Sequence, residues 1–197
     1  MSDTFARIHQ EIIDDPMNAD MTAKGYMPVY AAHPKARIVI VGQAPGIRAQ
    51  MSMKSWNDAS GDPLRSGVDI GEEGFYDPDI IALLPMDFDY PGKGNHGDLP
   101  PRKGFADTWH PRLLALMPHV QLIILVGGYS QAHYLGKHMK QNLTETVRAY
   151  HEYLPTYFPL VHPSPLNFRW QAKNTWFKET VVPELRRVVQ HTLKQAD

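Results

Sequence analysis

The chain has 197 residues, the length of one ordinary domain, and its 20 Lys and Arg residues nearly balance its 21 Asp and Glu residues at a formal net charge of −1. It contains no cysteine, which excludes disulfides, thiolate nucleophiles, cysteine-bound zinc and iron–sulfur clusters. No apolar run approaches the roughly 18–20 residues that span a bilayer, so we expect a single cytoplasmic, monomeric domain over residues 1–197, with no metal or other cofactor.

Short apolar runs that end in turn residues predict four buried strands. Their length and β-branched content favour strands over helices. In chain order they are Arg37–Val41, Ile80–Leu84, Val120–Val126 and Phe158–Val161. Helical patterns lie between and around them, at Thr4–Ile13, Ala106–Leu116, Ser130–Leu135 and about Trp176–Lys194, the last interrupted by Pro183.

This alternation of strands and helices indicates an α/β fold, a three-layer α/β/α sandwich around a four-stranded, mostly parallel sheet. In such a fold the functional site lies at the carboxyl ends of the strands. The polar segment Asp87–Lys103 is rich in Gly and Pro and shows no apolar period. We therefore expect it to be a long loop with a functional or mobile role.

A glycine-rich turn, Gly42-Gln43-Ala44-Pro45-Gly46, follows the first predicted strand. Such a turn leaves main-chain N–H groups without side-chain cover, so it can hold an anionic or carbonyl oxygen. Gln43 adds an amide, and Ile47–Met51 can begin a helix whose N-terminus strengthens the same field. A plain strand-to-helix turn explains the motif equally well when it is taken alone.

The last predicted strand runs into His162-Pro163-Ser164-Pro165-Leu166-Asn167. Two prolines fix φ and stiffen this loop, so His162 is presented in one orientation and Leu166 stands as an apolar tip. A rigid histidine suits a preorganised electrophile, and a rigid apolar tip suits a wedge that enters a base stack. A structural histidine and a core leucine are the alternatives for each residue by itself.

Together, the two loops resemble the two signature motifs of the uracil-DNA glycosylase superfamily, one after the first core strand and one after the last. The resemblance covers about residues 36–177. Ser55–Gly61 lies where these enzymes carry the aromatic residue that stacks on the base, here Trp56. Leu122–Gly128 followed by Ser130–Ala132 is similar to their strand, glycine turn and helix.

The resemblance implies hydrolysis of the N-glycosidic bond of uracil or another deaminated or damaged base flipped out of DNA, as in base excision repair. Negative charge then develops on the leaving base, and the enzyme must stabilise it. By position, His162 donates a hydrogen bond to that oxyanion, and the backbone of Gln43 and Ala44 holds the base carbonyls or the attacking water. Trp56 stacks on the base, and Leu166 fills the gap left in the duplex.

Two sets of binding residues follow from the resemblance. The first set surrounds the base and comprises Gly42, Pro45, Gly46, Trp56 and Met86. The second set contacts the rest of the DNA and comprises Ser164, Leu166, Asn167, Arg169 and Arg48. Several basic residues gather near the two loops, where phosphate contacts are needed, although each of them is equally explained as ordinary surface.

The chain departs from the superfamily pattern at its acidic residues. Gln43 and Ala44 stand where two large branches carry an acid, and no asparagine follows the second strand to read the base edge. Asp87 and Asp89 are the nearest carboxylates in the sequence. A carboxylate there can orient the water or accept a hydrogen bond from an N–H of a base other than uracil, or one or both acids can simply brace the long loop.

Two other functions stay open. A nucleic-acid- or nucleotide-binding member of the same fold would have lost catalysis together with the motif acids. A metal-dependent hydrolase would draw its ligands from one polar segment that contains Asp87, Asp89, His96, Asp98 and His110. No histidine pair has the helical i, i+4 spacing of metal ligands, which counts against the hydrolase.

Overall fold

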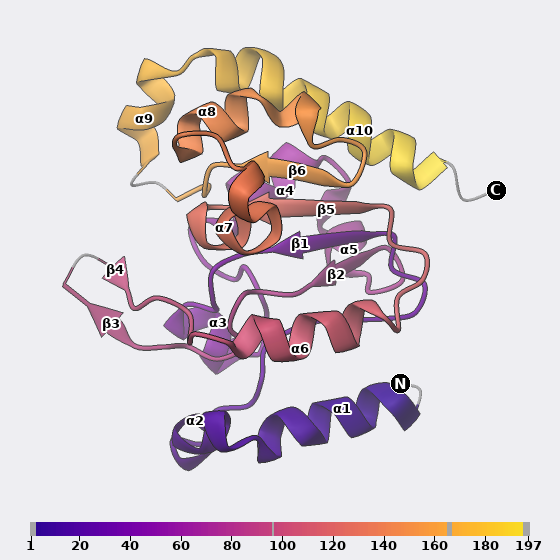
Figure 1. Ribbon diagram of the computed structural model, residues 1–197, viewed down its shortest axis with the longest axis vertical. Coiled ribbons are helices and arrows are strands. Elements are labelled where there is room, and N and C mark those ends of the chain that lie inside the picture. The colour runs from indigo at the N-terminus through magenta and orange to yellow at the C-terminus, as the bar shows by residue number, and fades with distance from the viewer. Residues whose placement is uncertain (1–2, 96, 165–166, 195–197) are drawn as a thin grey trace.

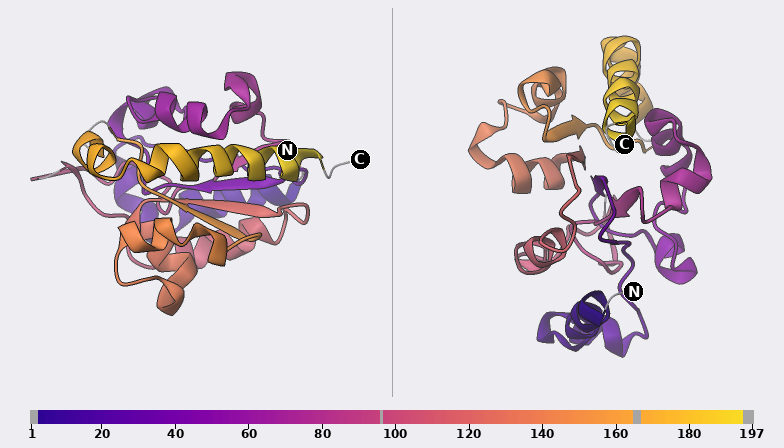
Figure 2. Two further views of the ribbon diagram at one scale, coloured as in Figure 1. Left: turned by 90° about the horizontal axis from the view of Figure 1, so that it is seen from above. Right: turned by 90° about the vertical axis from the view of Figure 1, so that its right-hand side faces the viewer.

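The computed structural model describes residues 3–95, 97–164 and 167–194. Its centre is a four-stranded sheet in the order β2-β1-β5-β6, and every neighbouring pair is parallel. The strands are β1 (Ile38–Val41), β2 (Ile81–Leu83), β5 (Leu122–Val126) and β6 (Tyr157–Leu160). Helices cover both faces of the sheet (Figure 1, Figure 2), which confirms the predicted α/β fold with its four strands.

The described helices agree with the predicted ones and add several that the sequence did not indicate. The α-helices are α1 (Asp3–Asp14), α2 (Ala19–Ala23), α3 (Ile47–Ser52), α4 (Gly61–Val68), α5 (Gly71–Tyr76), α6 (Phe105–Leu114), α7 (Gly128–Leu135), α8 (Leu143–Arg148), α9 (Phe168–Lys173) and α10 (Val182–Lys194). Shorter turns are η1 (Pro16–Asn18), η2 (Gly136–His138), η3 (Tyr150–Glu152) and the π-helical η5 (Phe177–Val181). None of the described helices is long and apolar enough to cross a membrane.

Each strand is buried on both faces because alternate side chains point into different helical layers. Ile38 and Ile40 of β1 join a core cluster with α4, α5, α8 and α10. Val39 and Val41 join a second cluster with α1, α6 and α7. The continuous apolar run of β1, rather than an alternating one, is therefore the pattern that a central parallel strand requires.

Pro183 does not interrupt the C-terminal helix in the way the sequence suggested. The π-helical turn η5 precedes it, and α10 begins at Val182, so Pro183 lies in the first turn. Proline is tolerated there because the first N–H groups of a helix have no intrahelical partner. The rest of α10 buries Leu185, Val188 and Val189 against the sheet.

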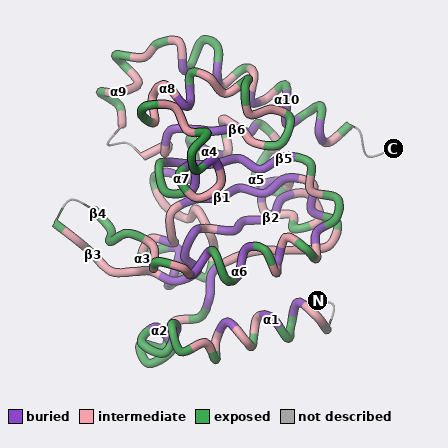
Figure 3. Tube along the Cα trace, viewed as in Figure 1, coloured by how far each residue is buried: buried purple, intermediate pink, exposed green. Residues whose placement is uncertain are grey.

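The long segment between β2 and α6 contains a hairpin that the sequence did not predict. Its two short antiparallel strands are β3 (Lys93–Gly94) and β4 (Gly97–Asp98). The hairpin projects from the edge of the molecule near α3 (Figure 1) and is largely exposed (Figure 3). Strands this short and polar carry no hydrophobic period, so sequence patterning could not reveal them.

The four strands of the central sheet all point the same way, so the loops that follow them gather at one edge of the sheet. The glycine turn Gly42–Gly46 follows β1, and Pro85 follows β2. Gly127 follows β5, and His162 follows β6. A parallel sheet therefore brings together residues that lie up to 120 positions apart, as from Gly42 to His162.

Candidate functional site

A small pocket opens where the loops after β1, β2 and β6 meet the segment between α3 and α4. Its volume is about 40 Å³. Both motif loops contribute to it, so the structure brings together the two regions that the sequence analysis paired. The lining residues are Gly42, Ala44, Pro45, Gly46, Ser55, Trp56, Asp58, Pro85 and His162.

Trp56 forms one wall of the pocket, and it packs closely against two glycines, Gly42 and Gly61. Its φ of 59° is in the left-handed region that bulky residues rarely adopt. A Cβ on Gly42 would lie 2.7 Å from Cζ2 of the indole, and a Cβ on Gly61 would lie 1.9 Å from the Trp56 carbonyl oxygen. Only glycine at both positions permits this close approach, so the placement of Trp56 is a specific feature of the fold.

His162 lies beside Trp56, with 5.6 Å between ring centroids and 34° between ring planes. The side-chain amide of Asn167 donates to the His162 carbonyl oxygen at 2.6 Å, which ties the loop back on itself. Burial lowers the pKa of His162 from its usual 6.5, and the charge of Asp58 opposes this shift. The imidazole is consequently neutral at pH 7, and it can donate one N–H without carrying a charge into the pocket.

Among the described residues that line the pocket, Asp58 is the only acidic one. The sequence patterns did not point to it. Its Oδ1 accepts the Ser60 N–H at 2.8 Å. Its Oδ2 lies 3.5 Å from the position that a Cβ on Gly46 would occupy. One carboxylate oxygen is thus anchored by the backbone, and the other faces the glycine turn.

The pocket has room for a few water molecules but not for a pyrimidine ring. The far end of the Trp56 indole closes the space over Gly42.

A family model described as the Uracil DNA glycosylase superfamily matches residues 29–186, a span that includes every residue lining this pocket. The chain belongs to the uracil DNA glycosylase superfamily. A solution NMR structure described as a "putative Uracil DNA glycosylase" from Methanosarcina acetivorans is also similar. The two share 14% sequence identity over 83% of this chain and 94% of that one, with a TM-score of 0.46.

Asp87 and Asp89 do not line the pocket of this superfamily member. Both side chains are fully buried and hold Arg102. Asp87 Oδ2 accepts from Nε and the main-chain N of Arg102 at 2.8 and 2.9 Å, and Asp89 Oδ2 accepts from Nη2 at 3.1 Å. The structure therefore favours the bracing role over the water-orienting role, because both carboxylates bind the same guanidinium and neither lines the pocket.

Arg102 extends this brace to the N-terminal region. Its Nη1 donates to the Met17 carbonyl oxygen at 2.6 Å and to Asn18 Oδ1 at 2.9 Å. Burial raises the pKa of Asp89 to about 6, although the charge of Arg102 opposes the shift. The cluster thus joins the segment after β2, the end of the long loop and η1 through one partly buried cation.

The side chains of Met86 and Gln43 do not line the small pocket. Met86 is 8% exposed and packs in the core, and its neighbour Pro85 lines the pocket instead. The Gln43 side chain donates to the Leu99 carbonyl oxygen at 3.1 Å, so it connects the glycine turn to the long loop. Neither position could be oriented from sequence, because a shift of one residue at a strand end moves a side chain to the other face.

The residues expected at DNA surround the His162 loop and α3. Arg48 and Arg169 are exposed, as phosphate-binding residues must be, and Asn167 is half-buried against the loop. Ser164 lines a different cavity, described below. Leu166, the predicted wedge, lies outside the described residues.

The predicted metal ligands do not converge. Among the described residues, no three His, Asp or Glu side chains are placed to hold an ion together. His110 is buried, with Nδ1 at 2.7 Å from the Tyr134 hydroxyl and Nε2 at 2.9 Å from the Pro85 carbonyl oxygen. His96 lies outside the described residues.

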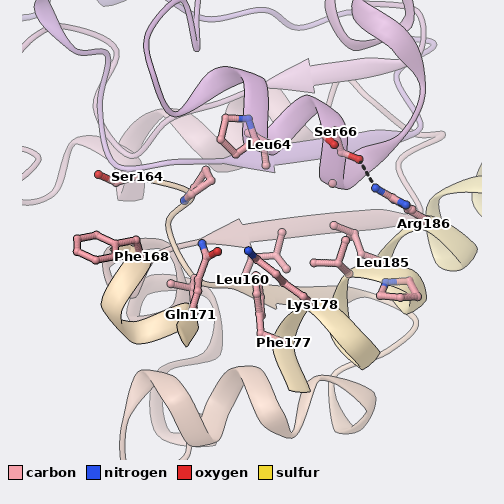
Figure 4. A pocket seen from close by; sticks show the side chains of 16 residues that line it. Leu64, Ser66, Leu160, Ser164, Phe168, Gln171, Phe177, Lys178, Leu185 and Arg186 are labelled. Atoms are coloured by element: carbon pink, nitrogen blue, oxygen red, sulfur yellow. Dashed lines mark hydrogen bonds between the residues drawn. The ribbon is translucent and has the colours of Figure 1, made fainter. Parts of the chain in front are cut away.

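Two larger cavities flank the His162 loop in this glycosylase-superfamily fold. One, of about 500 Å³, lies beside α7 and shares His162 with the small pocket. The other, of about 630 Å³, lies between α4 and the C-terminal helices (Figure 4). Its walls are mainly apolar, and Arg186 donates across one end to the Ser66 carbonyl oxygen at 2.9 Å. It borders Ser164 but not His162 or the glycine turn.

Proposed function

We propose that the protein is a monofunctional DNA glycosylase that hydrolyses the N-glycosidic bond of uracil or another deaminated or damaged base after flipping it out of the strand. The observation that carries this proposal is the pairing of Trp56 with His162 at the glycine turn. A leaving base anion requires an aromatic face for stacking, a neutral N–H donor and uncovered main-chain groups.

The chemistry follows from the groups in the pocket. As the bond between the base and C1′ breaks, its electron pair leaves with the base, and the sugar becomes cationic. The neutral imidazole of His162 donates to the base oxygen on which the negative charge collects. Water adds through its oxygen to C1′, and the carboxylate of Asp58 accepts the proton that the water loses.

The direct test is a panel of single-stranded oligonucleotides that carry uracil, hypoxanthine, xanthine or an alkylated base, followed by alkaline cleavage at abasic sites. Single strands impose the lowest cost of base flipping. Release of at least one base at a rate proportional to enzyme concentration supports the proposal. Binding of the same oligonucleotides without release of any base contradicts it and favours the non-catalytic nucleic-acid-binding member.

Asp58→Asn is expected to lower excision by about 10²–10⁴-fold, the range for one general base. The variant should fold normally, because an asparagine oxygen can still accept the Ser60 N–H that Asp58 Oδ1 accepts. The matched control is Asp62→Asn, which changes a carboxylate that is 87% exposed on nearby α4. Full activity of Asp58→Asn, measured as kcat on the best oligonucleotide, would remove this carboxylate from the mechanism.

Gly42→Ala is expected to move Trp56 and to lower excision by about tenfold, equivalent to part of one base-stacking interaction of about 1–3 kcal/mol. The added Cβ would lie 2.7 Å from the indole, and the ring end can move aside without unfolding the protein. The control is Gly67→Ala in α4, where a Cβ meets only Leu185 at 3.9 Å. A change in tryptophan fluorescence should accompany the loss in Gly42→Ala alone, and unaltered excision there would argue against stacking by Trp56.

A further inference from the structure

The cavity of about 500 Å³ beside the base pocket is assigned no role by the proposed reaction. It lies where the ends of β5 and β6 meet α7, α8 and α9. His162 borders both this cavity and the small pocket, and Gln43 lines it while its neighbours Gly42 and Ala44 line the small pocket. The residues that line it are Gln43, Val126, Gly127, Gly128, Tyr129, Ala132, Leu143, Val161, His162, Asn167 and Trp170.

Two aromatic side chains line this cavity, one from α7 and one from α9. Tyr129, at the start of α7, is 47% exposed although it lines the cavity. Trp170 of α9 is held in place, because its Nε1 donates to Thr144 Oγ1 at 2.9 Å and its ring packs edge-on against Trp176 and Phe177. One wall is therefore a fixed indole, and the other is an aromatic ring that is partly open to solvent.

The remaining walls suit a flat, partly polar ring. Val126, Val161 and Leu143 provide apolar surface. Gln43 and Asn167 also line it, and each amide donates one N–H to a carbonyl oxygen of the protein. The second N–H and the oxygen of each amide can hydrogen-bond to the edge of a base. Its volume is within the usual range of about 300–1,000 Å³ for ligand sites, whereas the small pocket is far below it.

We propose that this cavity holds the base of the nucleotide adjacent to the flipped one on the same strand. The inference rests on the proposed function, since it takes DNA as the substrate. Because His162 is a wall of both cavities, a strand whose target base enters the small pocket passes the second cavity with its next nucleotide. The larger cavity between α4 and α10 (Figure 4) does not border His162, so it is less suited to this base.

A consequence for substrate choice follows. A neighbouring base can reach the cavity only if it is unstacked and unpaired, and this cost is small in a single strand and a few kcal/mol in a duplex. The protein should therefore act on single-stranded or locally unpaired DNA in preference to a fully paired duplex.

The test uses three single-stranded oligonucleotides with the same target base. One is intact, one carries a tetrahydrofuran abasic analogue on the 5′ side of the target, and one carries it on the 3′ side. Excision and equilibrium binding are measured for the wild type, Tyr129→Ala and Tyr129→Phe. Of the two abasic oligonucleotides, we expect one to be bound and processed by the wild type about as well as the intact one. The other should show an affinity and a kcat/KM lower by about tenfold, within the range for one base–aromatic contact.

Tyr129→Ala should lose the contact to the neighbouring base, so its rate on the intact oligonucleotide should equal the wild-type rate on the oligonucleotide without that base. Removing the neighbouring base should then cause no further loss in Tyr129→Ala. Tyr129→Phe retains the ring and should behave as the wild type does. Equal wild-type rates and affinities on all three oligonucleotides would overturn the neighbour site and leave the glycosylase proposal standing. Binding that depends on the neighbour, without any excision, would support the site and contradict the proposed reaction. Absence of both binding and excision would contradict both.

Discussion

His162→Ala is expected to lower excision by about 10²–10³-fold, the loss that follows removal of one donor to a developing oxyanion. The half-buried, neutral imidazole beside Trp56 is a side-chain donor at the pocket. Because the lost contact forms mainly as the bond breaks, kcat should fall far more than the affinity for the intact oligonucleotide. Single-turnover rates and equilibrium binding of the same substrate measure the two effects separately.

Two controls separate this role from a structural one. His119→Ala removes an exposed histidine at the opposite, amino-terminal end of β5, and it should leave excision unchanged. Free imidazole should restore part of the lost rate to His162→Ala, because a small molecule can occupy the space of the missing side chain. Retained activity of His162→Ala, or a variant that no longer folds, would show that His162 serves the structure.

Arg102→Met is expected to lower the free energy of unfolding by about 3–5 kcal/mol, the usual cost of removing one partner from a buried ion pair. Asp87 and Asp89 are fully buried, and the variant leaves both without a cation. Methionine retains most of the apolar stem, so the loss should report charge and hydrogen bonding more than packing. Urea denaturation at pH 7.5 measures the change.

Arg187→Met is the matched control, because Arg187 is 64% exposed and pairs with Glu184 on the surface of α10. Arg187→Met should lower the free energy of unfolding by less than about 1 kcal/mol. Adding Asp87→Asn and Asp89→Asn to Arg102→Met should recover part of the stability by removing the uncompensated charges. If Arg102→Met lowered the free energy of unfolding no more than Arg187→Met does, Arg102 would not stabilise the fold through Asp87 and Asp89. The two acids would then again be candidates for orienting water.

Much of the fold is determined by local patterns in the sequence. The runs that became β1, β2, β5 and β6 are apolar, β-branched and bounded by turn residues, and these properties act within a few residues of each other. The glycine turn and the proline-rich loop after His162 are also local features, since glycine and proline restrict or release the backbone wherever they occur. Their convergence could be predicted as well, because parallel strands carry their carboxyl ends to one edge.

The roles of the acidic residues were decided by the tertiary structure. Asp87, Asp89 and Asp58 are all aspartates in polar segments, and nothing in the local sequence separates a brace from a pocket residue. The separation comes from Arg102, which lies 13 and 15 positions from the two buried acids, and from Gly46, which approaches Asp58 through the turn of the β1 loop. The sequence by itself determined which loops meet, because backbone preferences are local. Only the folded chain decided which carboxylate reaches the pocket, because a side chain's charge partner and burial depend on contacts between distant segments.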